Sequence, residues 1–199
     1  MDSTNVLVRE RILNEAAALF VQRGYDGISM REIAEACSLS KAGIYYHFKD
    51  KEALFLALLD SNLEKISLLI SEACSENKTT VECIRSFSLA IFTRMNGTQR
   101  AMIRLASQEM GKLSAEIRSG FAHRYQETFI DRISEMFRVG VQRRELRPLD
   151  PALATWVLLG MLYPFFSQGS EVRPDTPLDA VSGALDIFFY GAAHDQRAE

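Results

Sequence analysis

The segment Leu39–Phe55, with the sequence LSKAGIYYHFKDKEALF, carries two tyrosines and a histidine side by side, and these are aromatic side chains that can also form hydrogen bonds. If the middle of this segment is a helix, Ile44 and Phe48 lie four residues apart on one buried face. Tyr45 can pack its ring partly inward beside them. The side chains that remain to face a partner are Lys41, Ala42, Gly43, Tyr46 and His47.

These outward residues suit contact with nucleic acid. Ala42 and Gly43 are small enough to let a helix backbone approach base edges closely. Tyr46 and His47 carry hydrogen-bond donors for phosphate oxygens, and such contacts fix the register of a protein on a duplex. Lys51 falls in the first turn of the next expected helix, where free N–H groups also favour phosphate. An aromatic surface patch packed against another helix is the alternative that the pattern leaves open.

Two short helices joined by a turn of about four residues would position these side chains. Ser29–Ala36 and Lys41–Phe48 have the proportions of a helix-turn-helix, in which the second helix enters the major groove and the first crosses the backbone. Ser29 followed by Glu32 has the spacing of a capping box, and Ser40 can cap the second helix.

Net charge alone does not favour nucleic acid. The chain of 199 residues has a formal net charge of −3. Its first 52 residues carry seven Lys or Arg against eight Asp or Glu. DNA binding therefore has to depend on where the charges lie and not on their sum.

The composition predicts a soluble cytoplasmic protein with reduced thiols. No apolar run reaches the roughly 18 residues that cross a bilayer, and the N-terminus lacks the pattern of a signal peptide. The cysteines Cys37, Cys74 and Cys83 are widely spaced, so we expect neither a disulfide framework nor a zinc site. No acid–base pair, nucleophile elbow or phosphate loop is apparent, and we therefore expect no catalytic residues, no metal, no cofactor and no enzyme activity.

Helical periodicity dominates the chain and predicts an all-α fold of about nine helices. Gly24 is a good stop for the first helix, and Asp50 and Asp150 can cap later ones. Pro151 would take the first position of a helix, where proline is best tolerated. The expected helices cover residues 4–23, 29–36, 41–48, 51–75, 81–95, 99–110, 114–145, 151–168 and 178–193.

The string GYDGISMREIAEACSLSKAGIYYHFKDKEALF resembles the DNA-binding domain of the TetR family of bacterial transcription regulators. The resemblance covers about residues 6–66. It includes the end of the first helix, the S-x-R-E-I-A second helix, and the S-K-x-x-I-Y-Y-H-F recognition helix followed by K-D-K-E-x-L. One position departs from the pattern, because Ser38 stands where the turn usually has glycine. A left-handed conformation would cost serine about 1 kcal/mol there.

The resemblance implies roles for individual positions. Ser29 would meet phosphate at the start of the second helix, and Arg31 would reach a base or a phosphate. Lys51 would match the phosphate-binding lysine that opens the fourth helix. The DNA-binding residues expected in all are Ser29, Arg31, Ser40, Lys41, Ala42, Gly43, Tyr45, Tyr46, His47 and Lys51.

The family also implies two domains, a helix-turn-helix domain at residues 1–50 and a helical ligand-binding and dimerisation domain at residues 51–199. The segment ALATWVLLGMLYPFF is apolar nearly all round, so it and the final helix could form a four-helix bundle with a second subunit. A single fully buried core helix is the alternative. The expected dimer interface comprises Trp156, Leu159, Tyr163, Phe166, Leu185, Phe188 and Phe189.

An effector pocket could lie among the middle helices, because apolar pockets with few polar groups suit drug-like or lipid-like molecules. The candidate polar groups are Arg104, Gln108, His123 and Tyr125. Met and Phe at helical spacing also build ordinary cores, so plain packing is the alternative for each residue. The candidate lining residues are Phe87, Phe92, Met95, Met102, Leu105, Phe121, Tyr125, Phe129, Trp156, Leu159 and Tyr163.

The sequence thus predicts a ligand-responsive repressor that binds a palindromic operator as a homodimer. Its expected partners are double-stranded operator DNA, a second copy of itself and a small apolar or amphipathic effector, but no membrane. The alternative is a helical small-molecule-binding protein that has lost DNA recognition and acts through protein partners. A damaged recognition helix would indicate that alternative, and Lys41–Lys51 is intact.

Overall fold

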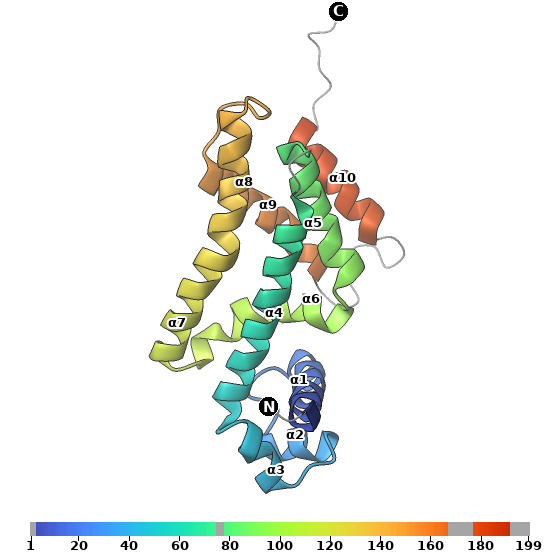
Figure 1. Cartoon of the computed structure of the whole chain (residues 1–199), viewed down its shortest axis with the longest axis vertical. Coiled ribbons are helices and arrows are strands. Elements are labelled where there is room, and N and C mark those ends of the chain that lie inside the picture. The colour runs from blue at the N-terminus through green and yellow to red at the C-terminus, as the bar shows by residue number, and fades with distance from the viewer. Residues whose placement is uncertain (1–2, 75–77, 167–176, 192–199) are drawn as a thin grey trace, which may run out of the picture.

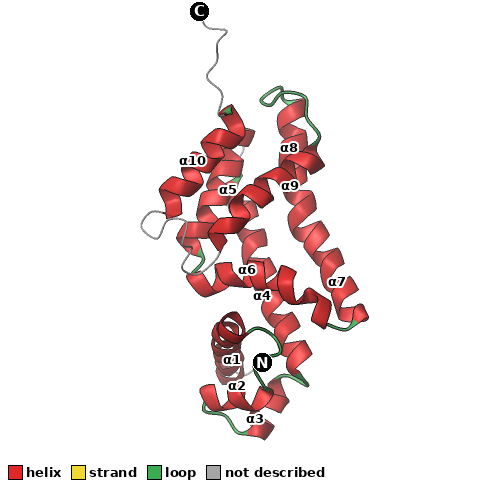
Figure 2. Ribbon diagram, turned by 180° about the vertical axis from the view of Figure 1, so that it is seen from behind, coloured by secondary structure: helices red, strands yellow, loops and turns green. Residues whose placement is uncertain are grey.

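A computed structural model describes residues 3–74, 78–166 and 177–191, and every regular element within these ranges is helical (Figure 1, Figure 2). A π-helical turn, Gln126–Ile130, joins α7 to α8 without a break, so the described residues form nine α-helical rods, as expected. The α-helices are α1 Ser3–Arg23, α2 Met30–Ala36, α3 Lys41–His47, α4 Lys51–Ala73, α5 Thr80–Arg94, α6 Gly97–Glu109, α7 Ala115–Tyr125, α8 Asp131–Gln142, α9 Pro151–Leu162 and α10 Pro177–Tyr190.

The helices α1, α2 and α3 gather at one end of the elongated molecule, and α4 runs from them into the rest of the chain (Figure 1). We call α1–α3 with the first turns of α4 the N-terminal head. The helix α6 lies across the middle, between the head and a layer formed by α5, α8, α9 and α10 (Figure 2). One continuous hydrophobic core links both parts, from Ile12 and Phe20 in the head to Leu158 and Leu185 at the far end.

The caps that the sequence predicts in the head are present. Ser29 and Glu32 form a reciprocal capping box at the start of α2. Ser40 Oγ accepts from Gly43 N at 3.0 Å, and Asp50 Oδ1 accepts from Ala53 N at 2.7 Å. These caps fix where the three consecutive helices begin and therefore the angles at which the chain enters them.

Three expected boundaries were wrong. The helix expected to reach residue 145 ends at Gln142, and Arg144 follows in a left-handed conformation with φ of 59°. The helix α6 begins at Gly97 and not near Thr98, because Asn96 forms a capping box with Gln99. The helix α9 ends at Leu162, and Tyr163–Phe166 continue as a 3₁₀ turn, because Pro164 has no backbone N–H to extend the α-helix. Residues 75, 167–168 and 192–193 of the expected helices lie outside the described residues. None of the described helices is long and apolar enough to cross a bilayer.

Candidate nucleic-acid interface

The turn between α2 and α3 closes with two backbone hydrogen bonds. Ser38 N donates to Glu35 O at 3.0 Å, and Leu39 N donates to Ala34 O at 2.9 Å. These are the two bonds of a Schellman motif, which requires a left-handed residue after the C-cap. Ser38 has that conformation, with φ of 52°, so serine occupies the strained position that the sequence indicated.

The helix α3 divides cleanly into an inner and an outer face. Ile44 is fully buried and Phe48 is 5% exposed, as the four-residue spacing predicts. On the outer face Lys41 and Ala42 are exposed, and Tyr46 is 75% exposed. A short helix anchored by its apolar side and open on the other is the geometry of a groove-reading element.

Gly43 shows that the fold itself does not demand glycine on α3. A Cβ built there would lie 3.4 Å from Ser40 Oγ and 3.6 Å from Leu39 Cβ, which are ordinary contacts. The absence of a side chain therefore leaves room on the outer face and relieves no internal clash.

The two α2 residues implied by the resemblance lie at the surface. Ser29 is exposed, although its hydroxyl and backbone N–H are both used by Glu32 in the capping box. Arg31 is exposed and its Nε donates to Glu35 Oε1 at 2.8 Å. Because that pair is an exposed i,i+4 salt bridge, it is weak enough to be exchanged for another acceptor.

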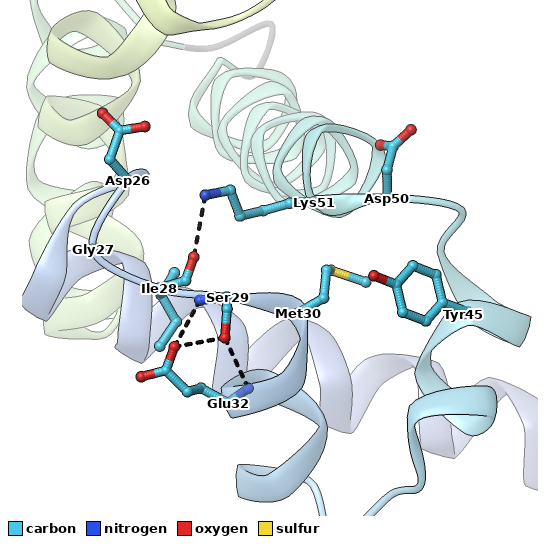
Figure 3. A pocket seen from close by; sticks show the side chains of 9 residues that line it. All are labelled: Asp26, Gly27, Ile28, Ser29, Met30, Glu32, Tyr45, Asp50 and Lys51. Carbon is cyan, nitrogen blue, oxygen red and sulfur yellow. Dashed lines mark hydrogen bonds between the residues drawn. The ribbon is translucent and has the colours of Figure 1, made fainter.

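Lys51 lies in the first turn of α4, beside the start of α2 (Figure 3). Its Nζ donates to Tyr25 O at 2.9 Å and to Ile28 O at 3.1 Å. It also lies 4.4 Å from the centre of the Tyr25 ring. Lys51 therefore fastens the α1–α2 turn to the start of α4, and the third proton of its ammonium remains for another acceptor.

A hollow of about 500 Å³ opens between the start of α2 and the end of α3. Tyr45 and Met30 face one another across it (Figure 3), and Tyr45 is exposed, not packed inward. His47 is half-buried and its ring meets Tyr46 edge-on at 5.1 Å. The hollow thus separates the aromatic residues of α3 from the capping box of α2.

Several acidic side chains of the head are engaged within the protein. Hydrogen bonds from the Ser29 side chain and backbone lower the pKa of Glu32, and a hydrogen bond from Lys112 lowers that of Asp26. The Lys112 Nζ lies 2.7 Å from Asp26 Oδ2. Asp50 is the cap of α4. Part of the negative charge of the head is therefore held in contacts within the protein.

The sequence did not indicate two contacts that α1 makes with α3. Asn5 Nδ2 donates to Tyr46 OH at 3.4 Å, and the Arg9 guanidinium lies 5.1 Å from the centre of the Phe48 ring. Both pairs are about 40 residues apart in the chain, so no local pattern could have revealed them. They place Asn5 beside the outer face and Arg9 beside the buried end of α3.

The residues predicted to line an effector pocket mostly pack against one another. Eight of the eleven are buried, Tyr125 is half-buried, and Trp156 and Tyr163 are exposed. Burial raises the pKa of Tyr125 to about 12. Arg104, Gln108 and His123 lie at the surface. None of these residues lines the four main hollows of the described chain, whose volumes are about 500, 290, 380 and 970 Å³.

The residues predicted for a dimer interface separate into two groups. Leu159, Phe166 and Leu185 are buried in the core of their own chain, while Phe188 and Phe189 are half-buried. Trp156 and Tyr163 are exposed. Five further apolar residues are also exposed on α9 and α10: Leu153, Val157, Leu178, Ile187 and Tyr190.

Comparison with known proteins supports the assignment of the head. Residues 12–58 match the profile of the bacterial regulatory proteins of the tetR family. Over 64 residues, 32% of this chain and 34% of the relative, the sequence is 39% identical to the transcriptional repressor AcnR of Corynebacterium glutamicum. It is 22% identical to the HTH-type transcriptional regulator YhgD of Bacillus subtilis over 90% of this chain and 93% of the relative.

Two solved structures extend the likeness over nearly the whole chain. The TetR-family regulator PfmR of Thermus thermophilus is 28% identical, with a TM-score of 0.77, over 92% of this chain and all of that one. AibR, solved in complex with isovaleryl coenzyme A and operator DNA, is 26% identical with a TM-score of 0.77, over 92% of this chain and 98% of that one. Residues 12–58, which contain the anchored short helix at residues 41–47, are thus similar to the bacterial regulatory proteins of the tetR family, and the chain shares its fold with the TetR-family regulator PfmR.

Proposed function

We propose that this protein is a ligand-responsive repressor that binds a palindromic operator as a homodimer. The observation that carries the proposal is the outer face of α3, where Lys41, Ala42 and Tyr46 are exposed above a buried Ile44 and Phe48. A two-turn helix held in this way can enter a major groove, and its backbone can approach base edges at Gly43.

Within this proposal the exposed side chains divide by role. Lys41 and Arg31 lie where they can reach bases, and a bidentate arginine or lysine contact discriminates by about 1–3 kcal/mol. Tyr46 and His47 bind phosphate and set the register. The third proton of Lys51 adds a phosphate contact at the start of α4.

Dimerisation is supported by the apolar stripe on α9 and α10. Trp156 is 55% exposed and Ile187 is 58% exposed, and a groove of about 970 Å³ between these helices is lined by Leu153, Val157 and Tyr190 among others. Gly160 and Gly183 face open space, so nothing in the described chain prevents another helix from approaching closely there. A second copy of the same surface would cover the stripe by two-fold symmetry, and the two recognition helices would then read two half-sites.

An effector of apolar or amphipathic character suits the body of the molecule. Its middle helices are filled by Phe87, Phe121 and Phe129, and the half-buried ring of Tyr125 packs against Phe129. A ligand could enter this aromatic core only if the rings move apart and lose their contacts with one another. AibR, whose structure contains isovaleryl coenzyme A, is a relative with a ligand of mixed apolar and polar character.

The test is selection of bound fragments from the host's genomic DNA with purified protein near physiological salt. Tyr46→Ala is the informative variant, and Leu68→Ala, which changes an exposed residue of α4 far from α3, is its control. We expect wild type and Leu68→Ala to recover one palindrome that Tyr46→Ala loses. If a folded dimer recovers no enriched sequence with or without a panel of acyl-coenzyme A compounds, the helical ligand-binding alternative replaces the proposal.

A further inference from the structure

Two cysteines remote from the head share a hollow with a methionine. Cys74 is the C-cap of α4, and Cys83 lies near the start of α5. Both line a cavity of about 290 Å³ together with Met136 of α8. Cys74 and Met136 also line the adjoining cavity of about 380 Å³. Three sulfur-bearing side chains from three helices therefore converge at one place that opens to solvent.

The two thiols are in contact with each other. Both cysteines are free, Cys74 at the surface and Cys83 buried. Partial burial of the thiol, followed by its hydrogen bond to Cys83, raises the pKa of Cys74 to about 12, against the opposing effect of Lys78 and Arg132. The two thiols therefore lie within hydrogen-bonding distance of each other.

The donor set excludes the common structural metals. Zinc takes four nitrogen, sulfur or oxygen ligands in tetrahedral geometry. Among the described residues no group of three or more His, Cys, Asp and Glu could hold a metal. The carboxylate that lines both cavities, Glu135, is bound by Arg138 Nε at 2.7 Å. What remains is two thiols and a thioether, and soft sulfur ligands of this kind select Cu(I).

We propose that Cys74, Cys83 and Met136 form a binding site for one thiophilic monovalent cation of the Cu(I) class. On binding, two S–H bonds break, two metal–sulfur bonds form and two protons pass to solvent. Met136 contributes a lone pair, and no electron is transferred. The resulting bis-thiolate centre has a net charge of −1, which the nearby cations Lys78 and Arg132 balance.

The site lies at the end of α4 that is remote from the head, so a bound cation could affect the head through this helix. A bound cation ties the C-terminal end of α4 to α5 and α8, and α4 extends from there to Lys51 in the head. Lys78 already holds this end of α4 by donating to Ala73 O at 2.9 Å. An effect of the cation on DNA binding would rest on the proposed function, whereas cation binding itself does not.

The test is anaerobic titration of the fully reduced, full-length protein with Cu(I), using ascorbate as reductant and bicinchoninate as competing chelator. We expect one Cu(I) per chain and a thiolate-to-copper absorption band in the ultraviolet. Cys74→Ser should weaken binding by more than the roughly 10-fold typical of losing an outer-shell partner, and Met136→Leu should weaken it less. Cys37→Ser, which alters the buried cysteine of α2, should bind like wild type.

Folding is checked separately, because Cys83 is buried. Cys83→Ser tests the second thiol ligand. If this variant shows no cooperative thermal transition, Cys83→Ala is used in its place. Retention of wild-type Cu(I) affinity by Cys74→Ser overturns the proposal. The proposal is also overturned if the reduced wild-type protein takes up no Cu(I) and instead forms a Cys74–Cys83 disulfide when treated with hydroperoxide. Either result leaves the DNA-fragment selection unaffected, so the two proposals fail independently.

Discussion

The Lys51 ammonium donates to the main-chain oxygen of Ile28 at 3.1 Å and, with the same atom, to that of Tyr25 at 2.9 Å. One side chain at the start of α4 thereby closes the turn that leads from α1 into α2. The Tyr25 ring beneath it also packs edge-on against Phe55 of α4, at 5.1 Å between centres. The position that the family resemblance assigns to phosphate is therefore also a structural tie of the head.

Lys51→Ala should destabilise the protein as well as weaken DNA binding. Two partly buried carbonyl oxygens lose a charged donor, and we expect the free energy of unfolding to fall by about 1–3 kcal/mol in urea denaturation. Lys49→Ala, which removes a more exposed lysine two residues away, should change it by less than about 0.5 kcal/mol. If the third proton of Lys51 binds phosphate, the variant also lowers the salt slope of DNA binding by about 1. Equal stability of the two variants would contradict the structural role.

Ser38→Gly should stabilise the head. Serine at φ of 52° pays for a left-handed conformation that glycine adopts freely, so we expect a gain of about 1 kcal/mol in the free energy of unfolding. Arg144 has a φ of 59° in the turn after α8, and Arg144→Gly should give a gain of the same sign. Ser40→Ala, which removes the cap of α3, should act in the opposite direction by about 1 kcal/mol. A loss of stability in Ser38→Gly would show that the side chain makes a contact that outweighs the strain.

Ile187→Asp should produce a monomer. It puts a charge in the middle of the exposed apolar stripe, and losing a hot-spot residue of about 2 kcal/mol raises the dimer dissociation constant by about 30-fold. Sedimentation velocity over a range of concentrations measures this shift. The control is Leu68→Asp on α4, a residue that is 60% exposed but lies outside the stripe. If Leu68→Asp dissociates the dimer and Ile187→Asp does not, the dimer interface lies on α4 and not on the apolar stripe.

Glu145→Gln should remove part of the loss of stability in acid. Hydrogen bonds from the Thr80 backbone and then its side chain lower the pKa of Glu145 below its ordinary value of 4.5, and the backbone bond is 2.6 Å long. A carboxylate with a lowered pKa in the folded protein contributes stability above its ordinary value and loses it as the pH falls through the folded pKa. The variant should therefore show a smaller fall in melting temperature below about pH 4.5 than wild type. Parallel melting curves of the two proteins between pH 7 and pH 3 would contradict this role.

Local patterns predicted the helices and their caps well because both depend on neighbours three or four residues apart. Ile44 and Phe48 are buried as their spacing required, and Ser29, Ser40 and Asp50 cap the helices expected of them. The position of α6 was less well predicted, because Asn96 forms a capping box with Gln99 and starts the helix ahead of Thr98. The motif in the head was specific enough to show the resemblance to the tetR family, which the match over residues 12–58 confirms.

Contacts between distant residues could not be predicted in this way. Whether an apolar residue of α9 points inward or outward depends on which helices cover it, so Leu159 lies in the core and Trp156 at the surface although both belong to one apolar run. Contacts between distant segments also produce the hydrogen bonds of Lys51 to the α1–α2 turn. They likewise bring Cys74, Cys83 and Met136 to one cavity and pair acidic residues of the head with their partners. The sequence by itself determined the helices and the helix-turn-helix, because those follow from short-range periodicity and capping, and its motif string carried the resemblance to the tetR family. Only the tertiary structure decided which side chains face a partner, because burial is a property of packed helices and not of any one of them.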